Sequence, residues 1–277
     1  MYDDADMRIM TLNVEFNGRD DTQGLGRSTT YITNLINTNQ PTVIGFQEYA
    51  SGCYSTIGTA ISNDYDVAFS KHTDENTVIY TPIYYRKDTL ELVDAGGGWL
   101  DSRYEGTNTK SYSWAVLKFK DTGKIFAVTN YHGAVVGTNY EEYKDWTEEQ
   151  LVALQQEWTA DNVRQLFDII ASIKFEHGDI PVVCVGDFNF NNTTPAYAKA
   201  IAGGLVEAET HATVSKRPGY RTTHGWGTAA RYGASIDHIF YYPESVTAYV
   251  HYVGATTEDE LCASDHLMVY ADIGFNS

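Results

Sequence analysis

One short stretch in the second half of the chain constrains the fold more than any other. Residues 180–185 form a mostly apolar run with three valines, and the run ends at Gly186. Such a run predicts a short buried strand. Glycine allows a sharp turn after it, so Asp187 and Asn189 are expected to point into the space beyond the strand, where α/β sheets usually hold their functional groups. A plain turn-capping role for Asp187 is the alternative.

Other predicted strands end in polar residues in the same way. Asn13 lies near the end of a strand predicted at residues 7–14, and Glu48 ends one predicted at residues 42–48. His132 comes just after an apolar run that ends near residue 129. Taken singly, Asn13 fits a turn former, Glu48 a residue at a helix start, and a lone histidine a structural role.

The remaining pattern alternates between helical and extended segments. Helices are expected at residues 28–39, 146–175 and 195–202, the second with a break near residues 159–161. Four or five strands are expected between residues 64 and 130, and turns at 86–88 and 121–123 indicate antiparallel hairpins. Residues 207–234 are expected to form loops, followed by strands at 235–242 and 267–273.

Length and composition favour one soluble domain with a large core. The chain has 277 residues, of which 43% are hydrophobic and 20% charged. A layered sandwich of two sheets accommodates this length, so we expect one domain over residues 7–275 with residues 1–6 as an extension. No apolar run is long enough to cross a bilayer, and the acidic first residues are unlike a signal peptide. A cytoplasmic protein and a secreted one with its signal removed both fit.

The charge balance disfavours a protein that holds polyanions by a broad basic surface. Lysine and arginine total 19 against 37 acidic residues, a net charge of −18. A nucleic-acid substrate would need a bound cation and a few local donors. The local concentration of basic and aromatic residues lies at 216–221 with 224–226 and Arg231, which suits phosphate contact or base stacking as well as an ordinary surface loop. The three cysteines are too few and too scattered for a disulfide framework or a CxxC metal site.

The polar residues at strand ends suit a hard cation. They are Asn13, Glu48, His132, Asp187, Asn189, Asp237, Asp265 and His266. Oxygen ligands without a cluster of cysteines or histidines favour Mg²⁺. Such a cation polarises a phosphoryl oxygen, while a carboxylate orients water and hydrogen-bonding groups meet the growing charge. The set therefore predicts hydrolysis of phosphate esters.

The order of these motifs resembles the endonuclease/exonuclease/phosphatase family, which includes pancreatic-type DNases, sphingomyelinases and deadenylases. The motifs are Leu12-Asn13, Gln47-Glu48, Asn130-Tyr131-His132, Gly186-Asp187-Phe188-Asn189, Ile236-Asp237-His238 and Ser264-Asp265-His266. They cover nearly the whole chain. The resemblance implies a four-layer α/β sandwich, with two packed mixed, mostly antiparallel β-sheets flanked by helices and the site at the sheet edges.

The resemblance also implies a role for each matching residue in a reaction without a covalent enzyme intermediate. Glu48 would be the principal Mg²⁺ ligand, supported by Asn13 and Asp265, and Mn²⁺ is a possible substitute. The residues that would act on the substrate follow. Asp187 would orient or deprotonate the attacking water, Asn189 would hold a phosphate oxygen, His266 would pair with Asp237, and His132 would stabilise the pentavalent state or protonate the leaving oxygen.

Two departures from the family pattern concern His132. The family often has Leu-Asp after this histidine, where this chain has Gly133-Ala134. Many members also place a glutamate seven residues before the strand-ending arginine, here Arg86, as a partner for the histidine. This chain has Ile79 there, which leaves the orientation of His132 unexplained, with Asp74 or Glu75 as substitutes.

A third departure is Lys110, which stands where many relatives have arginine. It is expected either to contact the phosphate as a point charge or to be an ordinary solvated lysine. The predicted function is a magnesium-dependent phosphodiesterase or nuclease, acting on nucleic acid or a small phosphodiester by in-line water attack, with a monomer favoured. The alternatives are a phosphomonoesterase of a small substrate, a non-catalytic binding module, and a zinc hydrolase, which the scarcity of spaced histidines opposes.

Overall fold

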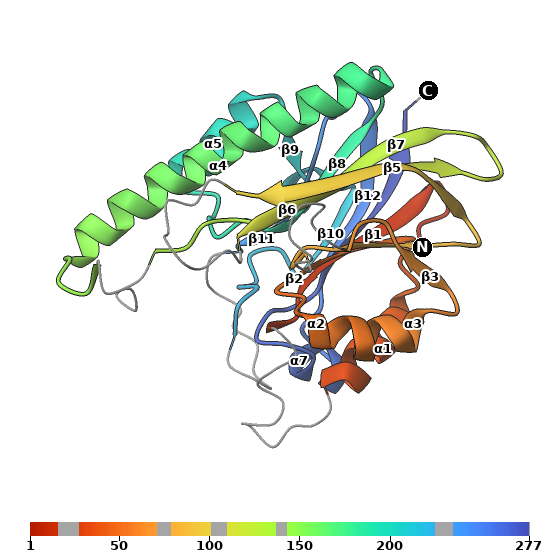
Figure 1. Cartoon of the computed structure of the whole chain (residues 1–277), viewed down its shortest axis with the longest axis horizontal. Coiled ribbons are helices and arrows are strands. Elements are labelled where there is room, and N and C mark those ends of the chain that lie inside the picture. Colours follow the sequence, from red (N-terminus) through yellow and green to blue (C-terminus); the bar gives the residue numbers. More distant parts are fainter. Residues whose placement is uncertain (16–27, 71–78, 101–109, 137–142, 225–234, 277) are drawn as a thin grey trace.

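Two β-sheets packed face to face form the centre of the protein, and helices cover their outer faces (Figure 1). This computed structural model describes residues 1–15, 28–70, 79–100, 110–136, 143–224 and 235–276. Each sheet buries one face against the other sheet and the opposite face against helices, which gives four layers. The predicted four-layer α/β sandwich is therefore confirmed.

The first sheet has β1 near its centre. Its strands lie in the order β10 (Val214–Lys216), β12 (Val246–Val253), β13 (Val269–Phe275), β1 (Met7–Asn13), β2 (Val43–Gln47), β4 (Ile83–Arg86) and β3 (Tyr65–Val67). β1 runs parallel to β2 and antiparallel to β13, so the sheet is mixed. Asn13 is paired with Gln47, so β1 and β2 end at the same edge.

The second sheet is also mixed. Its strands lie in the order β5 (Leu90–Trp99), β6 (Ser111–Phe119), β7 (Ile125–His132), β8 (Val182–Asp187), β11 (Asp237–Tyr241) and β9 (Val206–Glu207). β7 and β8 are parallel, and the other neighbouring strands of this sheet are antiparallel. The ends of β7 and β8 therefore meet at one edge of the sheet, as expected for a parallel pair.

Helices pack on the outer face of each sheet. They are α1 (Ser28–Asn39), α2 (Ser51–Cys53), the π-helical turn η2 (Tyr54–Gly58), α3 (Thr59–Ile61), α4 (Glu148–His177), α5 (Pro195–Ala202), α6 (Ala208–His211) and α7 (Glu258–Cys262). The long α4 lies along the second sheet, and α1, α2, α3 and α7 lie by the first (Figure 1). A capping box fixes the start of α4, because Thr147 and Gln150 each accept a hydrogen bond from the backbone N–H of the other.

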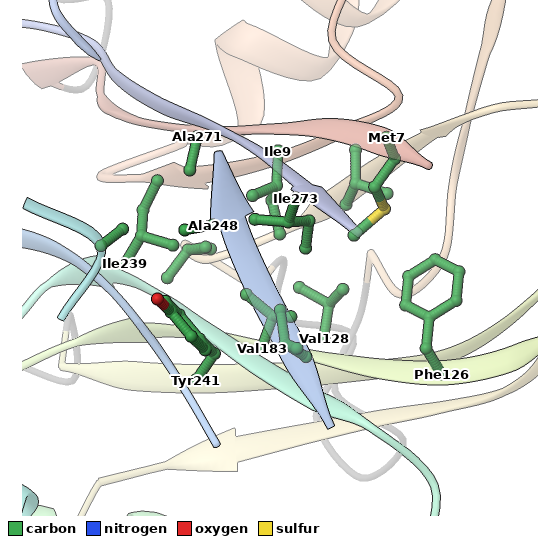
Figure 2. Close-up of a cluster of buried hydrophobic side chains, with 14 of the residues drawn as sticks. Met7, Ile9, Phe126, Val128, Val183, Ile239, Tyr241, Ala248, Ala271 and Ile273 are labelled. Carbon is green, nitrogen blue, oxygen red and sulfur yellow. The ribbon is translucent and has the colours of Figure 1, made fainter. Parts of the chain in front are cut away.

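Aliphatic and aromatic side chains fill the space between the two sheets (Figure 2). Ile9 and Ile273 enter from the first sheet, and Val183 and Ile239 enter from the second. Alternate residues of each strand face this core, as the period of a strand requires. The polar residues at the strand ends are an even number of positions from these core residues, so they also face the inner side of their sheet.

Most predicted elements are observed, with three corrections. The helix predicted at residues 28–39 is confirmed as α1, but α4 runs without the predicted break. Thr159 is accommodated inside α4 because its hydroxyl donates to the carbonyl of Gln155. The turn at residues 86–88 does not join a hairpin, because β4 and β5 belong to different sheets. Part of the predicted loop region is ordered as β9, α6 and β10.

The amino-terminal residues pack against the first sheet. The backbone N–H of Tyr2 donates to Asp272, and the Asp6 carboxylate accepts from the N–H of Phe275. The Tyr2 ring also stacks on Tyr249. Within the described ranges, none of the helices combines the length and the apolar character needed to span a membrane.

Candidate active site

Three of the predicted site residues form a row across the second sheet. His132 is opposite Asp187 in the parallel register of β7 and β8, and Asp187 is opposite Asp237 in the antiparallel register of β8 and β11. Residues opposite one another share a face of the sheet. All three side chains are buried, and they stand on the inner face where the apolar core ends. His132 Nε2 lies 3.5 Å from Asp187 Oδ2.

The first sheet brings Asn13 and Glu48 to this row. The Asn13 side-chain amide donates to Asp187 Oδ2 over 3.1 Å, and Glu48 Oε1 lies 3.7 Å from His132 Nε2. Glu48 has a φ of +51°, which is uncommon for a residue with a side chain. The unusual backbone turns Glu48 out of β2 toward the second sheet.

A layer of buried amides lies just inside this row, and sequence reasoning did not single it out. The Gln47 amide donates to Thr11 Oγ1 and to Asn130 Oδ1, and the Asn130 amide donates to the carbonyls of Phe46 and Pro82. These bonds join β2 to β7 across the two sheets. A Cβ at Gly45 would lie within 2.9 Å of both Val185 and Asn130, so glycine allows the close approach. The sequence signal for this layer was the presence of Gln47 directly before Glu48 and of Asn130 two positions before His132.

His266 and Asp237 form a buried pair, as the family resemblance implied. His266 Nδ1 lies 2.9 Å from Asp237 Oδ2, and His266 Nε2 lies 3.9 Å from Asp187 Oδ2. Burial lowers the pKa of His266, but the adjacent Asp237 carboxylate outweighs it and raises that pKa to about 10. Burial and the charge of Asp237 raise the pKa of Asp187 to about 6.

Thr222 holds the start of β11 in place and was also not predicted. It is fully buried, and its Oγ1 accepts hydrogen bonds from the backbone N–H groups of Ile236 and Asp237. Its backbone carbonyl accepts from the N–H of Leu267, next to His266. One residue thus ties together the two segments that carry Asp237 and His266.

Lys110 is a buried residue of this site. Its ammonium lies 2.6 Å from His132 Nε2, so the expectation of a solvated lysine is wrong. Burial lowers the pKa of Lys110, although the charges of Asp187 and Glu48 oppose this shift. Since an ammonium only donates, Nε2 of His132 is the acceptor. Lys110 therefore provides the partner that Ile79 leaves missing; Asp74 and Glu75 lie outside the described residues.

Asn189 is held at the mouth of the site by two hydrogen bonds. Its backbone N–H donates to Asp187 Oδ1, and its side-chain amide donates to the carbonyl of Gly133, each over 3.0 Å. Its φ of +53° is one that asparagine tolerates better than most residues. A Cβ at Gly133 would lie 2.4 Å from the carbonyl oxygen of Phe188, which explains why a larger residue does not follow His132 here.

Asp265 lies beside His266, in the segment before β13. Its Oδ1 is 3.3 Å from the hydroxyl of Ser264, and its backbone carbonyl accepts from the N–H of His224. Among the described residues, no hydrogen bond joins Asp265 to Asn13 or Glu48. A ligand role for Asp265 therefore stays a prediction.

The predicted basic loop is only partly described. Arg217 donates to the carbonyl of Val253 and to Thr256, and it lies over the ring of Tyr252. Arg221 donates to Thr223. Both guanidinium groups thus contact the protein itself, while residues 225–234, with Trp226 and Arg231, lie outside the described ranges.

The donors of the site fit a divalent cation. Asn13 and Glu48 present the amide and carboxylate oxygens that hard cations prefer. One carboxylate oxygen from each of Asp187 and Asp237 lies within 4.8 Å of the other and of a His266 nitrogen, although His266, as an imidazolium, would not itself be a ligand. The Oδ1 of Asp237 is buried and accepts no hydrogen bond from the described residues. A buried carboxylate oxygen without a donor is costly, and a cation nearby would offset that cost.

The chain is similar in sequence to one protein family and in fold to several solved structures. Residues 10–266 match the Endonuclease/Exonuclease/phosphatase family. No curated protein sequence gives a match. The fold is similar to that of an endonuclease/exonuclease/phosphatase from Bacteroides vulgatus, with 22% identity, a TM-score of 0.74, and coverage of 98% of this chain and 99% of that one.

Two further solved structures share the fold. A mannosyl-6-phosphatase from Bacteroides thetaiotaomicron is 20% identical with a TM-score of 0.77, over 97% of this chain and 100% of that one. The human Nocturnin catalytic domain with bound sulfate is 17% identical with a TM-score of 0.70, over 98% of this chain and 93% of that one. At these low sequence identities, the similarity to the two structures shows a shared fold and nothing about the substrate.

Proposed function

The chain belongs to the endonuclease/exonuclease/phosphatase family and is a phosphoesterase, and from this premise we propose that it hydrolyses phosphodiesters by in-line attack of water with a bound divalent cation. The observation that carries the proposal is the row of His132, Asp187 and Asp237 facing Asn13 and Glu48 across the two sheets. In this arrangement two carboxylates and a histidine of the second sheet face the hard-cation donors Asn13 and Glu48 of the first sheet.

Asp187 is the proposed base. Its two carboxylate oxygens accept from Asn13 and from the N–H of Asn189, so its orientation is fixed from both sheets. A pKa of about 6 leaves it ionised at neutral pH yet basic enough to take a proton from water. The water oxygen forms a bond to phosphorus while the ester P–O bond opposite it breaks.

Positive and hydrogen-bonding groups meet the charge that develops on the phosphoryl group. His266 is held as an imidazolium by Asp237, and Asn189 and Lys110 offer donors from the neighbouring elements. His132, whose Nε2 accepts from Lys110, is proposed to stabilise the pentavalent state by holding the Lys110 ammonium in place, and that ammonium is the proposed source of the proton for the leaving oxygen. A divalent cation held by Glu48, with Asn13 and Asp265, would polarise a phosphoryl oxygen as a Lewis acid.

A phosphomonoesterase is the second candidate. The similarly folded mannosyl-6-phosphatase acts, by its name, on a phosphomonoester. The His266 imidazolium lies 3.9 Å from Asp187, and the Lys110 ammonium lies beside His132, so both would help to balance the second charge of a monoester. The two candidates share every proposed catalytic residue and differ only in the preferred ester.

Hydrolysis of bis-p-nitrophenyl phosphate and p-nitrophenyl phosphate with Mg²⁺, Mn²⁺ or EDTA tests the proposal. We expect metal-dependent turnover that Asp187→Asn abolishes and that Asp179→Asn, a change at an exposed aspartate on the surface, leaves intact. The faster ester separates a diesterase from a monoesterase. Turnover that persists in Asp187→Asn, or in EDTA, would contradict the proposed mechanism.

A further inference from the structure

A pocket of about 340 Å³ opens beside the candidate active site. Its walls come from the exit of β7, the amino-terminal half of α4 and the segment after β8. The apolar residues that line it are Val135, Val136, Leu151, Val152, Phe190 and Ile236. This volume falls at the lower end of the range for small-molecule sites, and an apolar lining with a few polar groups is typical of them.

The pocket is continuous with the proposed catalytic residues. Asn189 lines the pocket, and its side-chain amide is held in the candidate site because it donates to the carbonyl of Gly133. Ile236 directly precedes Asp237 in the chain, and Val135 follows His132 closely. A group bound here would therefore lie next to a phosphoryl group held at Asn189.

Gln155 fixes the walls of the pocket in position. Its Oε1 accepts from the N–H of Val136 over 2.5 Å, and its side-chain amide donates to the carbonyls of Ala134 and Asn189 over 2.7 and 3.1 Å. Asn162, further along α4, accepts from the N–H of Ala134. The β7 exit, α4 and the β8 exit are thus joined before any ligand binds, so binding needs little reordering.

The chemistry of the lining selects the ligand. None of the described residues that line the pocket is basic, and the ionisable one is the acidic Glu148. Val135 and Val152 keep 38% and 48% of their surface exposed, so their side chains are accessible to an apolar group that enters the pocket. Among the described lining residues, a phosphorylated or otherwise anionic group would meet the Glu148 carboxylate and no counter-charge.

We propose that this pocket binds the uncharged apolar or aromatic group of the substrate, so that the natural substrate is a phosphate ester of a hydrophobic organic group. The proposal rests on the proposed function, because it assigns the pocket to the substrate of that site. It disfavours a polynucleotide or a multiply phosphorylated compound as the occupant.

The test compares two diesters with the same leaving group, phenyl p-nitrophenyl phosphate and methyl p-nitrophenyl phosphate, in Mg²⁺. Covering a phenyl ring in an apolar pocket should lower KM for the phenyl ester by about tenfold relative to the methyl ester. Val152→Asp should remove most of this preference and leave kcat and the KM for the methyl ester within about twofold, because Val152 lies at the exposed rim. Phe175→Asp, an exposed position further along α4, is the matched control.

Equal KM values for the two esters in the wild type, or equal effects of Val152→Asp on both, would overturn the proposal. A wild type that hydrolyses neither ester would instead count against the proposed function. In that case binding decides the matter: tighter binding of phenylphosphonate than of methylphosphonate, lost in Val152→Asp, would support the pocket, and equal dissociation constants would refute it.

Discussion

Two buried histidine–carboxylate pairs share strand β11, and they differ in what their histidines can still do. Asp237 points inward and pairs with His266, while the next residue, His238, points to the outer face and pairs with Glu207. Both histidines have a raised pKa, since the neighbouring carboxylate outweighs burial in each case. Charge alone therefore does not tell the two pairs apart.

The difference lies in the second nitrogen of each ring. His238 Nε2 lies 2.8 Å from the carbonyl of Phe190, and its Nδ1 lies 2.5 Å from Glu207. Both nitrogens of the imidazolium therefore donate to protein groups, and neither is left for a substrate. His266 Nε2 faces Asp187 at 3.9 Å, beyond hydrogen-bond distance. The outer pair fixes the segment after β8, and the inner pair keeps one nitrogen directed at the proposed reaction.

Removing the charge of the inner pair should have the largest effect. Asp237→Asn is expected to lower kcat on bis-p-nitrophenyl phosphate by about 10²–10⁴-fold, because His266 loses the carboxylate that keeps it charged. Steady-state kinetics with Mg²⁺ measure this. Glu207→Gln, assayed below its unfolding temperature, should keep kcat within about tenfold of the wild type. Equal losses in the two variants would mean that the pairs do not differ as described.

Breaking the outer pair should act on stability. Glu207→Gln leaves the His238 imidazolium buried without its counter-ion, and the free energy of unfolding should fall by about 3–5 kcal/mol. Urea denaturation measures the change. Glu91→Gln, which breaks the exposed pair with Lys118, should leave the midpoint unchanged. A similar shift in both variants would argue against a buried ion pair at Glu207.

A third buried histidine, His251, makes stability near the outer pair depend on pH. It is buried near Glu207 and His238, and burial lowers its pKa to about 4, so it stays neutral in the folded protein. Because the unfolded chain binds its proton near pH 6.5, stability should rise with pH between about 4 and 6.5 and be lost on acidification, by about 3 kcal/mol in total.

The pH dependence can be assigned by substitution. His251→Gln should flatten the rise in the free energy of unfolding between pH 4.5 and 6.5, whereas His211→Gln, at an exposed position, should leave it unchanged. His238 contributes in the opposite direction, since its raised pKa gives stability that is full below about pH 6.5 and lost above its folded pKa. An unchanged slope in His251→Gln would contradict the assignment.

The smallest expected effect concerns the support of the inner pair. Thr222→Val removes the acceptor of the N–H groups of Ile236 and Asp237, which should cost about 1–3 kcal/mol of stability and less than tenfold in kcat. Thr222→Ser should restore both, because it keeps the hydroxyl. A Thr222→Val variant with wild-type stability would contradict the role assigned to the Thr222 hydroxyl at the start of β11.

Local sequence patterns predicted the parts of the site that depend on strand ends. The apolar run before Gly186 and the polar residue at each strand end identified Asp187, Asn13 and Glu48, because alternation and a terminal glycine are properties of neighbouring residues. The observed contact of Asp237 with His266 followed from the family resemblance and not from any local pattern.

Contacts between distant segments were not predictable in this way. Glu207 lies in a stretch expected to be loop, so its pairing with His238 had no periodic signal. The sequence left Lys110 open between a phosphate contact and a solvated lysine, because nothing nearby in the sequence indicates its burial or its histidine partner. β12 and its buried His251 were missed for the same reason, since tertiary packing and not local propensity decides the position of that strand.

The place of β1 in the first sheet has a consequence for how the protein is made. β1 lies between β2 and β13, with Met7 opposite Ile273. A growing chain can pair β1 with β2 early, but the other edge of β1 stays open until β13 has left the ribosome, and open edges invite pairing with other chains. Asn13 ends β1 and His266 lies three residues before β13, so the candidate site is assembled only at that late step. A nascent chain would then be unable to hydrolyse phosphate esters before its fold is complete.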